Sequence, residues 1–237
     1  MLDTRLRSTD NDILVLWPPK NAVFGHLVTG PLETNCYIIG CKLEHEAVIV
    51  DPGAMLDSQL KEVERLMAET EVRLKYIVNT HGHADHIAGN RRLKELTKAR
   101  ILIHPLDSEK LTDASRNGSG LFGVAITSLP ADELVEESHI VRFGKLRLQV
   151  IHTPGHTPGS ISLLGDGFVF TGDTLFSGSI GVVEKPNGTP DPGGNYDQEV
   201  ESIRKRLLIL ADDIRIFPGH GPPSTIGRER QNNPFLR

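Results

Sequence analysis

The chain has 237 residues, of which 38% are hydrophobic and 24% are charged, a balance typical of a folded globular protein rather than a disordered chain. Lys and Arg number 26 against 31 Asp and Glu, and the net charge of −5 gives no basic footprint for nucleic acid. No apolar run approaches the roughly 18 residues that span a bilayer, and no apolar segment typical of a secretory signal follows the polar start. With two cysteines, Cys36 and Cys41, we expect a cytoplasmic protein that binds neither nucleic acid nor membrane.

The first half of the chain alternates short apolar runs with turns. Residues 1–20 predict an N-terminal extension, and residues 21–237 predict a single domain, because no linker or change in composition divides them. Periodicity predicts a helix over 57–70, with Asp57 or Ser58 as its N-cap, and a second helix over 87–98. Strands are expected at 35–39, 47–50, 75–79 and 101–103.

The second half repeats this rhythm after a stretch at 113–132 that is rich in Gly, Ser and Asn. We expect this stretch to form a long loop, which is typical of a binding loop or lid but also of a plain surface loop. A helix is expected at 196–211. Strands are expected at 139–143, 146–151, 160–164, 167–171 and 214–217. Two rounds of strands and helices predict two sheets packed together, with helices outside.

Four short segments follow the ends of expected strands and carry the polar chemistry. They are Thr80–His86 (THGHADH), His152–Ser160 (HTPGHTPGS), Phe170–Thr174 (FTGDT) and Pro218–Gly221 (PGHG). Loops that follow strand ends converge on one edge of a layered fold, and imidazole and carboxylate are ligands for Zn, Fe and Mn. Because Asp85 and His86 cannot easily reach an ion held by both His81 and His83, the spacing favours two ions side by side.

These four segments, in this order, resemble the metallo-β-lactamase superfamily, and the likeness covers about residues 25–237. The resemblance implies an α/β fold, an αββα sandwich of two mixed β-sheets flanked by helices. It implies two divalent metal ions per chain, with Zn as the first choice and Fe or Mn accepted by the same ligands. Its ligands would be His81, His83 and His156 for one ion, Asp85, His86 and His220 for the other, and Asp173 between both.

Within that superfamily the chain resembles the glyoxalase II-type hydrolases through residues 30–37, 152–156, 172–181 and 233–237. Two features of the chain differ from the pattern of these hydrolases. Both concern which thiol carrier the protein would accept, rather than the metal chemistry. Glyoxalase II enzymes carry a C-terminal helical domain that grips glutathione, whereas 17 residues follow His220 here. The chain therefore resembles a short, single-domain branch, but residues 182–194 lack the Arg that this branch has after Ser-Ile-Gly.

The resemblance implies a metal-dependent hydrolase that cleaves an activated acyl bond of a small molecule, first of all a thioester such as a hydroxyacyl-glutathione. A metal-bridging hydroxide would attack, Asp85 and Asp173 would serve as catalytic carboxylates, and the thiolate would leave readily because thiol pKa values are about 8.5. The alternatives are a mononuclear Fe(II) persulfide dioxygenase using His81, His156 and Asp173, and a lactonase or β-lactamase. A scaffold that binds metal without catalysis is the non-enzymatic alternative.

Three further residues are candidates for orienting the ligands. Asp51 and Thr80 lie close to the first histidine cluster in the expected topology, and His152 lies four residues before His156. The sequence leaves open, for each of them, a purely structural role.

Overall fold

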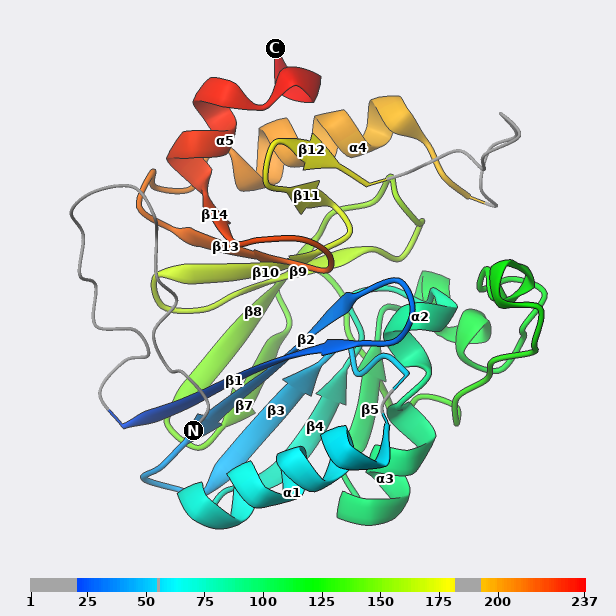
Figure 1. Ribbon diagram of the computed structural model, residues 1–237. Helices are drawn as coiled ribbons and strands as arrows, with labels where there is room; N and C mark the ends of the chain where they lie inside the picture. Colours follow the sequence, from blue (N-terminus) through cyan, green and yellow to red (C-terminus); the bar gives the residue numbers. More distant parts are fainter. Residues whose placement is uncertain (1–20, 55, 182–192) are drawn as a thin grey trace.

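The computed structural model describes residues 21–54, 56–181 and 193–237 (Figure 1). The extension expected at 1–20 and most of the unusual stretch at 182–194 lie outside these residues, so the division of the chain into an extension and one domain stays a prediction. Over the described ranges, no helix combines the length and apolar character that crossing a membrane requires.

The first sheet comes from the N-terminal half of the chain and has six strands in the order β1-β2-β3-β4-β5-β6. Its first three strands pair antiparallel and the remaining pairs are parallel, so the sheet is mixed. The strands are β1 (Ala22–Thr29), β2 (Thr34–Cys41), β3 (Glu46–Val50), β4 (Arg73–Val78), β5 (Arg100–Ile103) and β6 (Glu133–Leu134).

The second sheet has six strands in the order β14-β13-β10-β9-β8-β7 and is also mixed, because β10 and β13 pair parallel while the other pairs are antiparallel. Its strands are β7 (Ile140–Phe143), β8 (Leu146–His152), β9 (Ile161–Leu164), β10 (Phe168–Gly172), β13 (Arg215–Pro218) and β14 (Ser224–Thr225). A small hairpin of β11 (Leu175–Phe176) and β12 (Ser179–Ile180) follows β10.

Helices cover the outer faces of both sheets (Figure 1). Beside the first sheet lie α1 (Asp57–Thr70), α2 (Ala84–Ile87) and α3 (Asn90–Thr97), and beyond β5 come the 3₁₀ turns η1 (Pro105–Leu111) and η2 (Ser119–Phe122). Beside the second sheet lie α4 (Tyr196–Ser202), the π-helical turn η3 (Ile203–Leu207), α5 (Ile226–Asn232) and η4 (Pro234–Leu236). The expected αββα sandwich of two mixed sheets is confirmed.

Alternation along the strands builds three apolar layers. In β2, Cys36 and Ile38 pack with α1 and α3, whereas Tyr37 and Ile39 face the second sheet. The layer between the sheets is rich in fully buried rings. A third layer joins the second sheet to α4, η3 and α5. This packing leaves the polar strand ends to gather at one edge of the sandwich.

The helix expected over 87–98 is present as α3 but begins only at Asn90, because a separate short helix, α2, ends at Ile87 and a break follows it. At the break, the backbone N–H of Gly89 donates to the carbonyl of Pro52 at 2.8 Å. A Cβ added to Gly89 would lie 2.6 Å from the carbonyl oxygen of Gly53. Close approach to the turn after β3 therefore interrupts the helix, and it needs glycine.

Two other helix limits differ from expectation. The N-cap of α1 is Leu56, whose N–H donates to the Gln59 side chain at 2.9 Å, rather than Asp57 or Ser58. The helix expected over 196–211 ends with the π-helical turn η3. Arg230 of α5 donates to the carbonyls of Leu208 at 3.0 Å and Leu210 at 2.7 Å, and these bonds replace a further helical turn.

Candidate metal centre

The four polar segments meet at one edge of the sandwich, as their positions after strand ends predicted. The first follows β4 and runs into α2, the second follows β8, the third follows β10, and the fourth begins at the end of β13. The seven histidines and aspartates expected there lie together, in two groups that share one carboxylate. They are His81, His83, Asp85, His86, His156, Asp173 and His220.

The first group consists of His81, His83 and His156. Nε2 of His156 lies 3.3 Å from Nε2 of His81 and 2.9 Å from Nδ1 of His83. Nε2 of His81 lies 3.1 Å from the same Nδ1 atom. Nitrogen ligands at about 2.0–2.1 Å from one ion take a similar mutual spacing. The three nitrogens therefore converge on one point, as ligands of a single cation do.

The second group consists of Asp85, His86 and His220. Nε2 of His86 lies 3.3 Å from Nε2 of His220 and 3.3 Å from Oδ2 of Asp85. Nε2 of His220 lies 3.2 Å from the same carboxylate oxygen. The hydroxyl of Thr34 donates to that oxygen at 3.0 Å and fixes its direction. Two imidazoles and one carboxylate again point at a common centre.

Asp173 lies between the two groups. Its Oδ2 atom is 3.7 Å from Nε2 of His156 in the first group and 3.4 Å from Nε2 of His220 in the second, and its Oδ1 atom is 3.4 Å from Nε2 of His86. The buried Oδ1 atom has no hydrogen-bond partner among the described residues. A buried carboxylate oxygen without a partner is costly, and a bridging cation would satisfy it.

Electrostatics in the metal-free protein favour the protonation state that a ligand needs at His81 and Asp173, but they oppose it at His86 and His220, whose pKa values are raised. Burial, together with His86, His156 and His83, lowers the pKa of His81 well below its usual value, which keeps that ring neutral. Burial opposes ionisation of Asp173, but His86 and His220 hold the pKa of its carboxyl well below the usual range. Burial also opposes charge on His220, but hydrogen bonds to Asp173 and Asp85 raise its pKa to about 10. A metal ion would compete with that proton.

Asp51 and Thr80 stand behind the histidines, as expected. The backbone N–H and the hydroxyl of Thr80 donate to the two oxygens of Asp51, at 2.7 and 2.6 Å. The Thr80 hydroxyl also lies 3.1 Å from Nδ1 of His81, and Oδ2 of Asp51 lies 3.0 Å from Nδ1 of His86. Asp51 thus faces a histidine of each group, His81 through the Thr80 hydroxyl and His86 directly as an ion pair.

Residues of β2 fasten the loop that carries His220, a role that the sequence did not predict. The Tyr37 hydroxyl donates to the carbonyl of Pro218 at 2.8 Å, and the Asn35 amide donates to the carbonyls of Pro218 and Gly221 at 3.0 and 2.9 Å. Nδ1 of His220 lies 2.9 Å from the carbonyl oxygen of Leu32. The segment 30–37 stood out in the sequence as part of a resemblance, but no local signal gave it this function.

Two other candidates from the sequence supply none of the seven clustered side chains. Nε2 of His152 lies 2.9 Å from the carbonyl oxygen of Pro158, and its ring stacks on His104 at 4.2 Å between centroids, so these contacts of His152 hold a loop rather than a ligand. The stretch at 113–132 is a loop containing η2, fastened at its base by Asn117, whose carbonyl accepts from the N–H of Ala84 at 2.8 Å. Its role in binding stays a prediction.

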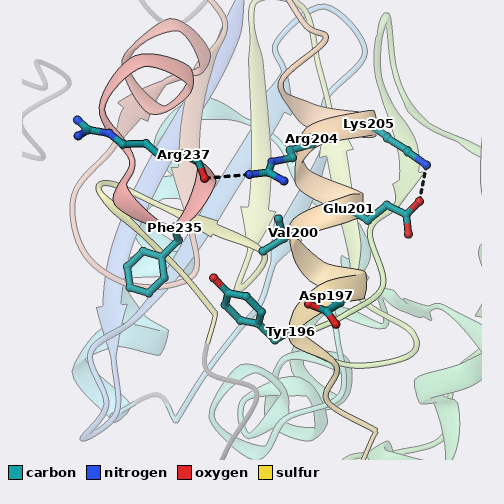
Figure 2. A pocket seen from close by; sticks show the side chains of 8 residues that line it. All are labelled: Tyr196, Asp197, Val200, Glu201, Arg204, Lys205, Phe235 and Arg237. Carbon is teal, nitrogen blue, oxygen red and sulfur yellow. Dashed lines mark hydrogen bonds and ion pairs between the residues drawn. The ribbon is translucent and has the colours of Figure 1, made fainter.

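A hollow of about 410 Å³ lies between α4 and the C-terminal residues, and Figure 2 shows its lining. Two of its three basic side chains already have partners, because Arg204 donates to the carbonyl of Arg237 at 3.2 Å and Lys205 pairs with Glu201 (Figure 2). None of the seven clustered residues lines it. We therefore assign the chemistry to the histidine cluster and none to this hollow.

Comparison with known proteins agrees with the geometry. Residues 29–220 match the family model of the metallo-β-lactamase superfamily. A hydroxyacylglutathione hydrolase of Haemophilus influenzae, GloC, is 34% identical over 208 residues, which cover 86% of this chain and 93% of GloC. The crystal structure of the B3 metallo-β-lactamase BLEG-1 superposes with a TM-score of 0.80 at 33% identity and covers 90% of this chain and 99% of BLEG-1.

A third similar protein bears on the metal content. The crystal structure of TTHA1623 in a di-iron-bound form has a TM-score of 0.72 at 32% identity, and the match covers 90% of this chain and 100% of TTHA1623. Sequence motifs, sandwich fold, paired ligand groups and these likenesses agree with one another. The chain belongs to the metallo-β-lactamase superfamily.

Proposed function

We propose that this protein is a dinuclear metal-dependent hydrolase that cleaves the thioester bond of a small acyl-thiol, such as a hydroxyacyl-glutathione. The observation that carries the proposal is the position of Asp173 between two complete groups of ligands. The second group supplies the ligands that a second ion requires. The likeness to GloC supports a hydroxyacylglutathione as the first substrate to test.

The residues present fit two divalent cations. His81, His83 and His156 would hold one, Asp85, His86 and His220 the other, and the unpartnered oxygen of Asp173 fits a bridging role. Imidazoles and carboxylates of this kind suit Zn, and they also accept Fe or Mn. When bound, the two cations would act as Lewis acids and lower the pKa of a water so that it can attack near neutral pH.

The accessible edge of the cluster determines where a substrate could enter. The side chains of His81, His86 and His156 are buried, whereas that of His220 is 25% exposed and those of Asp85 and Asp173 are 13% and 11% exposed. We therefore place the acyl carbonyl along this carboxylate edge. Asp85 and Asp173 would act as the catalytic carboxylates by holding the attacking water there and accepting its hydrogen bonds.

The leaving group decides between acyl substrates. A thiolate leaves without protonation because thiol pKa values are about 8.5, so a thioester needs no dedicated general acid. An amine leaving group does need a proton, which makes a β-lactam a harder substrate for this set of residues. The likeness to BLEG-1 nevertheless makes a β-lactam the second candidate. Both candidates are small molecules, and the buried free thiols of Cys36 and Cys41 agree with the cytoplasm that we propose as the compartment.

The test combines metal content with turnover on one preparation. We expect about two metal ions per chain by elemental analysis, release of thiol from S-D-lactoylglutathione, and loss of that release in His83→Ala. His45→Ala is the matched control, because His45 is exposed and its ring lies 2.8 Å from the carbonyl of Glu71, on another part of the fold. The control should retain both metals and full turnover.

Other outcomes would overturn the proposal in distinct ways. Two metals with turnover of nitrocefin but not of the thioester would indicate a β-lactamase. One iron per chain, with oxygen uptake on glutathione persulfide and no thiol ester cleavage, would indicate the dioxygenase. Two metals with turnover of a lactone alone would indicate a lactonase, and two metals with no turnover of any of these substrates would indicate a metal-binding scaffold.

A further inference from the structure

A buried carboxylate that belongs to neither ligand group touches both loops of the first group. Asp107 lies in η1, just after β5, and its side chain is fully buried. It thus follows the end of a strand of the first sheet, as the histidine segment after β4 does. The sequence drew no attention to it, because a single Asp in the run His104–Asp107 forms no recognisable motif.

Both oxygens of Asp107 accept hydrogen bonds from the loop that carries His156. One of them also accepts a hydrogen bond from the loop that carries His81 and His83. Oδ2 accepts from the backbone N–H of Gly82 at 2.8 Å and from the hydroxyl of Thr157 at 2.7 Å. Oδ1 accepts from the backbone N–H of Gly159 at 3.1 Å. Gly82 lies between His81 and His83, and Thr157 directly follows His156. One side chain therefore joins the backbones that carry all three nitrogens of the first group.

The two histidine loops approach η1 so closely at Gly82 and Gly159 that no side chain would fit there. A Cβ added to Gly159 would lie 2.7 Å from both the Cβ and the backbone nitrogen of Asp107. A Cβ added to Gly82 would lie 2.6 Å from Cβ of Lys110 and 3.0 Å from the carbonyl oxygen of Asp107. Both loops thus pack directly on η1, and the close packing requires glycine at these two positions. The turn η1 can therefore support both loops.

A buried counter-ion keeps this carboxylate charged. Nζ of Lys110, whose side chain is 9% exposed, lies 3.1 Å from Oδ1 of Asp107. Burial alone would raise the pKa of Asp107, but Lys110, Thr157 and Gly82 hold it below its usual value. An ionised carboxylate only accepts hydrogen bonds, so both of its oxygens can serve N–H and O–H donors of the loops.

We propose that Asp107 is the positioning residue of the first metal group, the buried clamp that holds the loops of His81, His83 and His156 at the spacing one cation requires. It acts on those histidines through Gly82, Thr157 and Gly159. The second group depends instead on Thr34, Asn35 and Tyr37. Apart from Asp51, which faces both groups, the two ions therefore have different supports.

Because the two groups have different supports, the proposal can be tested by measuring the Zn²⁺ affinity of each group. This test does not depend on which substrate the protein cleaves. Asp107→Asn keeps the shape of the side chain but turns one acceptor oxygen into an NH₂ group, which faces loop donors that it cannot bind. We would introduce it into two backgrounds that each disable one group, His220→Ala and His83→Ala. Affinity for Zn²⁺ is then measured by competition with a chromophoric chelator.

In the His220→Ala background, the ion remains on the first group, and we expect Asp107→Asn to weaken Zn²⁺ binding about 10-fold or more, as loss of an outer partner of metal ligands does. In the His83→Ala background, the ion remains on the second group, and we expect a change below about 2-fold. Equal weakening in both backgrounds, or none in the first, would overturn the proposal.

Two further variants separate positioning from general stability. Asp132→Asn is the matched control, because Asp132 also pairs with a lysine, Lys94, and accepts a backbone N–H, that of Ile101 at 2.7 Å, away from the cluster. It should lower the unfolding temperature without changing either Zn²⁺ affinity. If Asp107→Asn does not fold, Thr157→Val removes one clamp bond with little change in shape. It should weaken the first group alone by a smaller factor, and unchanged affinity in that variant would overturn the proposal.

Discussion

Nδ1 of His86 lies 3.0 Å from Oδ2 of Asp51, while Nε2 of the same ring faces Asp85, Asp173 and His220. A ring held in this way presents a fixed nitrogen to the second ligand group. Asp51 sits at the end of β3 with a φ of 50°, a left-handed conformation that Asp and Asn tolerate better than other side chains. The turn that ends this strand thus serves the candidate metal centre directly.

Replacing Asp51 with Asn should weaken binding of both ions. The substitution keeps the left-handed turn, but an amide cannot supply two acceptor oxygens to the N–H and hydroxyl of Thr80, and it removes the negative charge beside His86. We expect Zn²⁺ affinity to fall about 10- to 100-fold, with the fold intact by circular dichroism. Unchanged affinity in the chelator competition would mean that this carboxylate serves the turn alone.

Removing the hydroxyl of Tyr37 should loosen the loop of His220. Tyr37→Phe keeps the buried ring but loses the 2.8 Å hydrogen bond to the carbonyl of Pro218. We expect a loss of about 1–2 kcal/mol in the free energy of unfolding, measured in urea, because a buried acceptor loses a partner. Tyr76→Phe is the control, since this ring lies at the border of the same apolar layer. An equal effect of both substitutions would contradict the role given to the Tyr37 hydroxyl.

The stability of the metal-free protein should fall as the pH rises, because of Glu199. Burial raises the pKa of this carboxyl from 4.5 to about 8, with its Oε1 accepting from the N–H of Gly181 at 3.0 Å. Between these two pH values the folded protein keeps a proton that the unfolded chain releases. The free energy of unfolding therefore declines with rising pH, by at most about 1.4 kcal/mol per unit.

Glu199→Gln should remove this dependence. In chelator-treated protein, its stability relative to the wild type should rise steadily from pH 5.5 to 7.5 in urea unfolding. Glu201→Gln, on the exposed face of the same helix beside Lys205, should give a constant difference over this range, because the lowered pKa of Glu201 keeps it ionised throughout. A constant difference for Glu199→Gln as well would show that its carboxyl is already ionised in the folded protein.

Adding one methyl group at Gly89 should destabilise the site-bearing edge of the first sheet. The new Cβ would lie 2.6 Å from the carbonyl oxygen of Gly53 and 2.8 Å from that of Pro52, and both are backbone atoms that cannot turn away. We expect Gly89→Ala to cost about 1–3 kcal/mol by urea unfolding. Gly120→Ala, where a Cβ meets no atom within 4 Å, should cost far less, and equal costs would contradict the packing argument.

The ligand residues that follow strand ends could be predicted from the sequence, because several of them stand close together in one short segment. The string at 81–86 contains four of the seven clustered side chains within six residues, and the order of the other three segments supplied the rest. Hydrophobic periodicity gave α1 its limits and placed most strands of the two sheets. The sandwich then followed from two rounds of strands and helices.

Features that depend on contacts distant in the sequence could not be predicted. The break between α2 and α3 comes from Gly89 meeting Pro52 and Gly53, and nothing near Gly89 signals that meeting. Asp107 acts on loops 25 and 50 residues away. Short edge strands such as β6 and β14 have two residues each, too few for a periodic pattern.

The most direct test of the account is to remove the metal and return it in measured amounts. Chelator-treated protein would receive Zn²⁺ in steps, and release of thiol from S-D-lactoylglutathione would be followed at each step. Two ligand groups that share Asp173 predict no turnover without metal and maximal turnover near two equivalents per chain. Full turnover at one equivalent, or turnover that survives chelation, would contradict a dinuclear metal-dependent thioester hydrolase.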